Sequence, residues 1–177
     1  MAFDLERVRA RLEAIPADFA NKVARAGFFP AAVYESGTHV AYVAAIQEFG
    51  APERNIPPRP FMRPAIEQHK AEWVQAMGKA VAASTAGAIS ADDALDRIGD
   101  KVASDIQATL ENGSYAPLSP TTVLLRKWRR EGRTITGRTV GEAAAAVAAD
   151  PSLIEGVNAD PLRDTGLLIA SVSHDVS

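Results

Sequence analysis

The sequence predicts an α+β fold in which two or three long amphipathic helices cover a small antiparallel sheet, with an alanine-rich insertion near the C-terminus. Apolar residues recur at helical spacing in two consecutive segments, 64–83 and 90–112, which only a short polar stretch separates. A connection this short favours antiparallel neighbours. Short β-compatible segments lie before and after the pair, at 28–35 and 171–176. A sheet and a helix pair bury their apolar faces against each other, which favours one shared core.

The composition is that of an ordinary globular protein. The 177 residues suit a single domain, 1–177, with 47% hydrophobic and 23% charged residues. A net charge of −3 does not indicate a nucleic-acid or membrane partner. No apolar run approaches the ~18 residues of a membrane span. The absence of cysteine excludes disulfides, thiolate zinc sites and a cysteine nucleophile.

The N-terminal segment predicts an amphipathic helix. Its apolar stripe consists of Leu5, Val8, Leu12 and Ile15, with Phe19 and Val23 as an extension. Pro16 interrupts the stripe, so we expect a kink or two short helices that end near Gly27. The segment is charged and lacks a continuous apolar core, so it is not expected to be a signal peptide.

Two short segments follow. Phe28–Glu35 is apolar and ends at the turn sequence Ser36-Gly37-Thr38, which predicts a strand. Val40–Phe49 fits either a second strand or a short helix. Its alanine content and the positions of its larger apolar residues favour a helical turn; these are Val40, Val43 and Ile46.

A proline-rich connector joins these segments to the helix pair. It contains four prolines, and a fifth, Pro64, follows shortly. Because proline lacks a backbone donor and restricts φ, Ile56–Pro60 is predicted to be stiff and extended, and neither a central strand nor a helix interior. Phe61 and Met62 follow as anchors, and Pro64 suits the first position of the next helix.

The helix pair carries two apolar stripes. The first helix, Pro64–Ala83, has these residues on one face: Ile66, Trp73, Met77, Ala80 and Val81. Trp73 and Met77 indicate either a core or an intersubunit contact. The second helix starts at Ser90, a suitable cap, and ends at Asn112-Gly113. Its stripe consists of Leu95, Ile98, Val102, Ile106 and Leu110.

The next segment combines a helix with a basic run. Ser119 and Pro120 predict a helix start, and Leu124 and Trp128 share a face of the helix, which runs to about Glu131. The basic run consists of Arg126, Lys127, Arg129, Arg130, Arg133 and Arg138. Three interpretations stay open: a solvated helix flank, a contact with an acidic partner protein, or a contact with DNA phosphates, which would depend strongly on salt.

The C-terminal region predicts an insertion and a last strand. Residues 133–160 are interpreted as an insertion or mobile arm with an alanine-rich helix, Thr139–Ala149, that Asp150-Pro151 ends. Asp164 is predicted to cap a helical turn at Leu167–Ile169. Ser171–Val176 alternates weakly and predicts the last strand.

No group of residues has the pattern of an active site. Asp164-Thr165-Gly166 matches the aspartic-protease tripeptide, but that chemistry needs two carboxylates that share a proton, and the flanking residues differ. No glycine-rich phosphate loop is present. His39, His69 and His174 lack the spacing of a zinc site. We therefore expect no catalytic activity, no cofactor and no metal ion.

Three blocks of the sequence share a resemblance. They are AAIQEFGAP with IPPRPFMRPAI in residues 44–66, APLSPTTVLLRK in residues 116–127, and PLRDTGLLIASVSHDV in residues 161–176. In this order they resemble the virion-morphogenesis proteins, which are tail-completion or neck proteins of Mu-like and lambdoid tailed phages. The blocks cover roughly half of the chain. The connection over 133–160 is longer than the family pattern and departs from it.

The resemblance implies a structural virion protein with an α+β fold, made in the host cytoplasm and located in the neck. It would assemble with itself into a sixfold ring that completes the tail and joins it to the DNA-filled head. Its partners would be a head-side connector protein, the tail tube or tail terminator protein, and transiently the genomic DNA. The alternatives are a tail terminator that caps the tube and a small nucleic-acid-binding protein that uses Arg126–Arg138.

Two groups of residues are candidate contacts under this resemblance. The candidates for a subunit or partner interface are Arg59, Phe61, Met62 and Arg63. Burial of Phe61 in the domain's own core is the alternative. The candidates for contact with a partner or with DNA are Arg126, Lys127, Arg129, Arg130 and Arg133.

Overall fold

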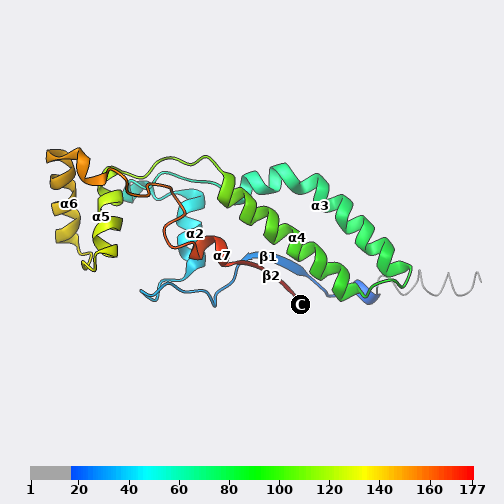
Figure 1. Ribbon diagram of the computed structural model, residues 1–177. Helices are drawn as coiled ribbons and strands as arrows, with labels where there is room; N and C mark the ends of the chain where they lie inside the picture. The colour runs from blue at the N-terminus through cyan, green and yellow to red at the C-terminus, as the bar shows by residue number, and fades with distance from the viewer. Residues whose placement is uncertain (1–16) are drawn as a thin grey trace, which may run out of the picture.

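The computed structural model describes residues 17–177 and confirms the α+β class. Two long helices, α3 (Met62–Thr85) and α4 (Ala91–Asn112), run antiparallel beside an antiparallel sheet (Figure 1). The sheet pairs β1 (Ala24–Phe28) with β2 (Val172–Val176). The other elements are α2 (Val40–Phe49), α5 (Pro120–Arg130), α6 (Gly137–Ala149), α7 (Leu167–Ala170) and two 3-10 turns, η1 (Pro52–Arg54) and η2 (Pro151–Ile154). The helix predicted over Leu5–Ile15 lies outside the described residues.

Helix α4 is the central layer. It packs on α3 along one side and on both strands along the other (Figure 1). The predicted stripe is confirmed, since Leu95, Ile98, Ile106 and Leu110 are buried and Val102 is half-buried. Ser90 and Asp93 form a reciprocal capping box at the start of α4, and Gly113 follows its last residue, both as the sequence indicates.

The principal core lies where the connector and the C-terminal segment meet α4. Phe61 is fully buried there, and its ring makes an edge-on contact with Phe28 at a centroid distance of 5.8 Å. The other buried members are Val40, Ala44, Ala65, Ala103, Ile106, Leu110, Leu162, Leu168 and Val172. Full burial of a large apolar side chain stabilises a fold by about 1.5–3 kcal/mol. Phe61 therefore anchors the connector to the body.

The first strand occupies a different segment from the predicted one. The prediction placed it at Phe28–Glu35, but β1 spans Ala24–Phe28. Its residues pair with Val172–Val176 in antiparallel register, so the partner strand selects which residues become β1. Pro30 has no backbone N–H to continue the ladder, and the chain turns there.

Two smaller expectations at this end are also wrong. Gly27 was predicted to end a helix, but it lies within β1 at φ 144°. Val23 was predicted to extend a helical stripe, but its backbone pairs with Ser177 through two hydrogen bonds of 2.7 and 3.1 Å. Both residues join the sheet because the C-terminal segment supplies backbone hydrogen-bonding partners. The local sequence around Val23 and Gly27 contains no signal for these partners.

Helix α2 and the connector follow the sequence prediction. Val40–Phe49 is helical, as its spacing favours. Ile56–Pro60 is extended and belongs to no strand; its backbone is held by an isolated bridge between Ile56 and Ala51 and by a hydrogen bond from the Arg59 amide to the Gln47 oxygen. Helix α3 starts at Met62, two residues before the predicted start, so Pro64 is its third residue. That position is still compatible with proline because the first helical amides have no partner within the helix.

The buried face of α3 differs from the predicted stripe at one position. Ile66 is 46% exposed, whereas the neighbouring Ala65 is fully buried. Trp73 and Met77 are half-buried against α4, and Ala80 is buried, as predicted. Among the described elements α3 packs chiefly on α4, so its contact face is narrow and holds mainly small residues.

A second helix pair, α5 with α6, lies at the other end of the elongated molecule (Figure 1). Ser119 caps α5 by accepting a hydrogen bond from the amide of Thr122, as predicted. Leu124, Ala143 and Val147 form a small core between the two helices. The predicted alanine-rich helix is confirmed as α6, and this part of the 133–160 segment is folded against α5.

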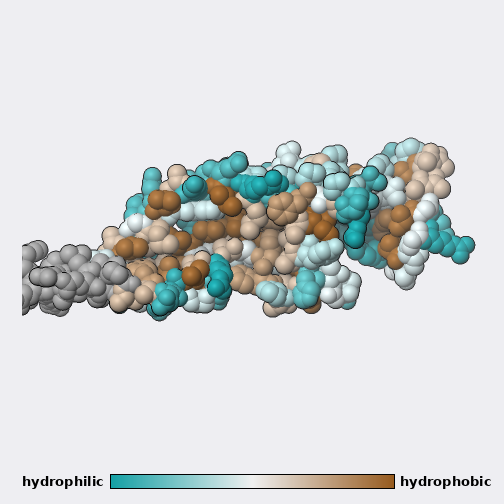
Figure 2. Space-filling view, turned by 180° about the vertical axis from the view of Figure 1, so that it is seen from behind, coloured by the Kyte–Doolittle hydropathy of each residue, from teal (hydrophilic) through white to brown (hydrophobic). Residues whose placement is uncertain are grey.

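The C-terminal turn and strand are confirmed as α7 and β2. Figure 2 shows apolar side chains that reach the surface along the middle of the molecule, between hydrophilic margins. Within residues 17–177, no helix combines the length and the apolar content that crossing a membrane requires.

Candidate functional site

Glu48, near the end of α2, holds the connector against the body. Its carboxylate is buried and accepts hydrogen bonds from the backbone N–H groups of Phe61 (2.7 Å), Met62 (2.9 Å) and Arg63 (3.3 Å). These amides have no partner within α3, so a carboxylate from another helix caps its N-terminus. Burial raises the pKa of Glu48, but hydrogen bonds from the Arg63 side chain and from the three amides outweigh it and lower the pKa below its ordinary value.

Arg63 completes this cap from the solvent side. Its Nε donates to Oε1 of Glu48 at 2.8 Å, and its terminal nitrogen donates to the backbone oxygen of Glu48 at 3.0 Å. The guanidinium also lies over the ring of Phe49, 5.4 Å from the ring centroid. A cation–π contact at an exposed site contributes about 0.5–1 kcal/mol. This contact holds the exposed side chains of Phe49 and Arg63 together beside the proline-rich connector.

Gly50 allows the chain to fold back on itself at the end of α2. Its φ is 77°, a conformation that other residues rarely adopt. A Cβ at this position would lie 2.9 Å from both the oxygen of Ile56 and the nitrogen of Pro58. Only glycine therefore fits between α2 and the connector.

Arg59 links the connector to the segment between α4 and α5. Its side chain is buried, and its guanidinium donates to the backbone oxygens of Ala116 (2.7 Å) and Pro117 (3.1 Å). A third hydrogen bond of 3.0 Å reaches Oε1 of Gln47. The guanidinium therefore makes its hydrogen bonds inside the domain. These bonds join the first of the three resembling blocks to the second.

Asp164 joins the third block to the second. It was predicted to cap the helical turn α7, but Gly166 is the cap residue of α7, without a side-chain hydrogen bond. The Asp164 carboxylate instead forms ion pairs with Arg126 (3.5 Å), Arg129 and Arg130 (2.9 Å). Three guanidinium groups of α5 attract the carboxylate more strongly than one short turn does.

The rest of the basic run is also engaged within the chain. Lys127 donates to the backbone oxygen of Leu153 at 3.2 Å. Arg133 pairs with Glu142 at 3.1 Å, and its guanidinium lies 3.8 Å from the ring centroid of Trp128. Arg138 pairs with the same glutamate at 3.3 Å. These contacts favour the interpretation of a solvated flank, because phosphate binding needs charges that are available.

A groove with a volume of about 790 Å³ lies beside the basic run. Its walls are the turn at 34–38, helix α2, helix α5 with its flanking residues, and the segment 162–168. Its charged lining includes Arg126, Arg129 and Asp164. Apolar side chains such as Leu125 and Ile135 line it as well. The sequence analysis did not predict this groove, because its walls come from four separate segments.

An apolar stripe on α2 faces away from the core. Tyr42 and Phe49 are 54% and 68% exposed, and they lie two helical turns apart with Ile46 between them. The buried residues Val40, Ala44 and Glu48 occupy the opposite side of the helix. We call the stripe and its neighbour the α2 surface; it consists of Tyr42, Ile46, Phe49 and Arg63.

The four predicted interface residues have different environments. Phe61 and Arg59 are buried in the domain, and Met62 is half-buried against its core. Arg63 alone has a largely exposed side chain. Of the two interpretations of Phe61, its position supports the core. The α2 surface was missed, although apolar residues on two opposite sides of one short helix are a signal that a single core does not account for.

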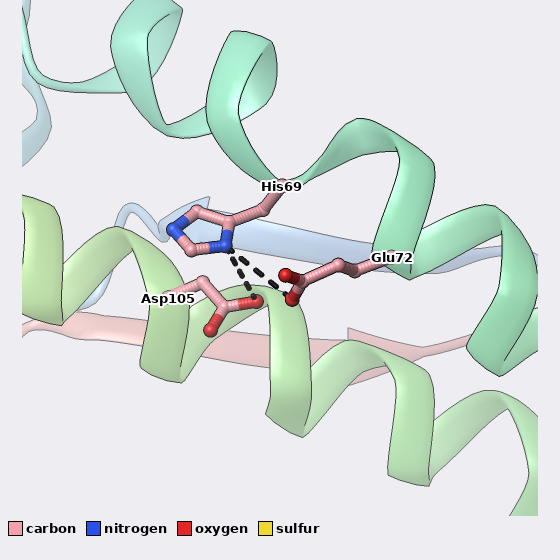
Figure 3. Close-up of side chains that lie close together, drawn as sticks. All are labelled: His69, Glu72 and Asp105. Atoms are coloured by element: carbon pink, nitrogen blue, oxygen red, sulfur yellow. Dashed lines mark ion pairs between the residues drawn. The ribbon is translucent and has the colours of Figure 1, made fainter.

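A second group of polar side chains lies between α3 and α4. His69 and Glu72 of α3 and Asp105 of α4 turn toward one another (Figure 3). The Nδ1 atom of His69 is 3.6 Å from a Glu72 oxygen and 3.9 Å from an Asp105 oxygen. Spacing among histidines could not reveal this cluster. The available signal was a histidine and a glutamate three residues apart on one helix, next to an acidic residue of the following helix.

The fold and these contacts define the chain as an α+β protein with a capped connector and an exposed apolar helix surface. Comparison with protein-family models, with curated proteins and with solved structures found no significant match. The resemblance of the three blocks to virion-morphogenesis proteins therefore stays a prediction.

Proposed function

We propose that this protein is a structural component of a phage neck, located in the virion, which completes the tail and joins it to the DNA-filled head. The supporting observation is that the three resembling blocks are in contact with one another. Arg59 of the first block donates to Ala116 and Pro117 of the second, and Arg126 of the second pairs with Asp164 of the third. Blocks that are far apart in sequence thus build one unit, as expected if they serve one purpose.

In this proposal the protein acts by assembly and not by turnover. It packs side by side with copies of itself into a sixfold ring, between a head-side connector protein and the tail tube or tail terminator protein. A ring requires two different complementary surfaces on each subunit. The α2 surface supplies one of them, because it is apolar, exposed and supported by the rigid cap that Glu48 and Arg63 form.

The test is complementation of a phage that lacks this gene with a Phe49→Ser variant. Phe49 is 68% exposed, so the substitution should leave the folded protein intact. We expect DNA-filled heads beside free tails of normal length in electron micrographs of the lysate, and a large loss of infectious particles. Val74→Ser is the matched control, since Val74 is 66% exposed on α3 and lies outside the α2 surface; it should complement fully.

Other outcomes separate the alternatives. Tails of uncontrolled length would indicate a tail terminator. Full infectivity of a phage without the gene would refute a virion role altogether. Normal complementation by Phe49→Ser, with a phage that does need the gene, would remove the α2 surface from the proposal and leave the neck role in place.

A further inference from the structure

We propose that His69, Glu72 and Asp105 form a binding site for a divalent transition-metal ion, with Zn²⁺ as the best-fitting ion. The three residues come from two helices that lie side by side, and their ligand atoms all lie within 4.8 Å of one another. This site is independent of the assembly role. A bound ion would tie α3 to α4 (Figure 3).

The imidazole nitrogen is the observation that carries the inference. Nδ1 of His69 is shielded from solvent and has no hydrogen-bond partner among the described residues. It faces two carboxylate oxygens at 3.6 and 3.9 Å, beyond the length of a hydrogen bond (Figure 3). In the imidazole tautomer that carries its proton on Nε2, a lone pair at Nδ1 faces two anionic oxygens, and this arrangement becomes favourable when a cation lies between them. A buried polar atom without a partner is unfavourable, and a bound ion would supply that partner.

The spacing suits a shared ion. Zinc binds nitrogen and oxygen at about 2.0–2.2 Å in a tetrahedron, which places two ligand atoms about 3.3–3.5 Å apart. The observed separations of 3.6 and 3.9 Å are only a few tenths of an ångström wider. Three protein ligands leave the fourth position to water, which can enter because the Glu72 side chain is 62% exposed. One imidazole with two carboxylates favours zinc over magnesium or calcium, which prefer oxygen ligands alone.

Neighbouring side chains orient two of the three ligands. The indole N–H of Trp73 donates to Oδ2 of Asp105 at 2.6 Å. The rings of Trp73 and His69 stack with a centroid distance of 6.2 Å and an interplanar angle of 21°. Outer contacts of this kind fix the direction of ligands and typically change metal affinity by about 10- to 100-fold.

Lys101 competes with the ion for the same oxygens. Its ammonium lies 3.1 Å from Oδ2 of Asp105 and 3.6 Å from Oε2 of Glu72. It therefore supplies the cation to both carboxylates when no metal is bound, but it leaves the imidazole nitrogen without a partner. A metal would displace the ammonium, and the competition must weaken metal binding.

The test is a calorimetric titration with ZnCl₂ of the full chain, from which metal has first been removed with a chelator. We expect one equivalent to bind, and Co²⁺ at the same site to give the visible absorption of four-coordinate cobalt. His69→Ala and Glu72→Gln should each weaken binding by at least about tenfold. Lys101→Met should tighten binding, which a purely structural ion-pair network would not do. His39→Ala is the matched control, because His39 is exposed and remote from the cluster.

Two results would overturn the proposal. Zinc binding of equal strength in the native protein and in His69→Ala would show adventitious binding only. No binding by any of the proteins, Lys101→Met included, would refute the site. Glu72→Gln serves as the second ligand variant should His69→Ala fold poorly, since Glu72 is mostly exposed.

Discussion

At the scale of single residues, Glu48 has a structural role that its place in the sequence does not indicate. In the sequence it is one of many glutamates on a helix. In the structure its buried carboxylate accepts hydrogen bonds from three backbone amides and from one guanidinium nitrogen. Hydrogen bonds to a charged group contribute about 1.5–3 kcal/mol each, partly offset here by the burial of the charge. The carboxylate thus fixes where the connector ends and α3 begins.

Glu48→Gln should lower the free energy of unfolding at pH 7 by about 2–4 kcal/mol, because an amide cannot replace a charged acceptor. The pKa of Glu48 in the folded protein lies below its ordinary value of 4.5, so its contribution is complete above that value and is lost as the pH falls through the lowered pKa. The stability of the native protein should therefore decrease more steeply below pH 4.5 than that of the variant.

Urea denaturation at several pH values measures both effects. Glu67→Gln is the matched control, because Glu67 is an exposed glutamate near the start of α3, the helix that Glu48 caps; it should behave as the native protein does. Equal stability of Glu48→Gln and Glu67→Gln at pH 7 would contradict the role of Glu48.

At the scale of elements, the contact of α4 with the sheet depends on a glycine. Gly99 is buried in α4, where an added Cβ would lie 2.7 Å from Cδ2 and 3.0 Å from Cβ of His174 in β2. Nε2 of His174 is also 2.8 Å from Oδ1 of Asp96 in α4. The absence of a side chain at Gly99 therefore sets how closely β2 approaches the helix.

Gly99→Ala should destabilise the protein by roughly 1 kcal/mol, because overpacking costs about 1–3 kcal/mol and better helix propensity returns about 1 kcal/mol. Gly78→Ala in α3 is the matched control, since nothing lies within 4 Å of the added carbon. It should stabilise the protein by about 0.5–1 kcal/mol. Thermal unfolding of both variants measures the difference, and two shifts of the same sign would refute the close contact.

At the scale of the whole molecule, Arg59 connects the two ends. It joins the connector to Ala116 and Pro117, which lead from α4 to the α5–α6 pair. The contact of Arg126 with Asp164 and with the backbone oxygen of Asp160 attaches α5 to the C-terminal segment. The elongated arrangement in Figure 1 thus depends on a few long-range polar contacts as well as on apolar cores.

Arg59→Ala should lower the free energy of unfolding by about 3 kcal/mol, because three hydrogen bonds from a buried, charged guanidinium are lost. Amide hydrogen exchange should accelerate first in residues 113–119 and in α5, before it accelerates in α4. Arg54→Ala, which removes an exposed arginine from the same connector, is the control and should change neither quantity. Exchange that accelerates uniformly over the chain would contradict a local attachment.

The sequence by itself determined the features that depend on residues close to one another. The capping box of Ser90, the start of α5 at Ser119 and Pro120, and the extended prolines of Ile56–Pro60 all agree with the structure. Each involves a side chain and backbone groups within about four residues, so short segments carry the whole signal. The pair of long helices, α3 and α4, followed from the same kind of local signal, the helical periodicity of their apolar residues.

Only the tertiary structure decided the features that need a distant partner. The position of β1 depends on pairing with β2 near the other end of the chain, which moved the strand from Phe28–Glu35 to Ala24–Phe28. Asp164 serves three arginines of α5 instead of a nearby cap, and Asp105 meets His69 across two helices. Glu48 and the α2 surface acquire their roles in the same way. Long-range register and charge pairing depend on how the elements dock, and no local spacing in the sequence encodes that.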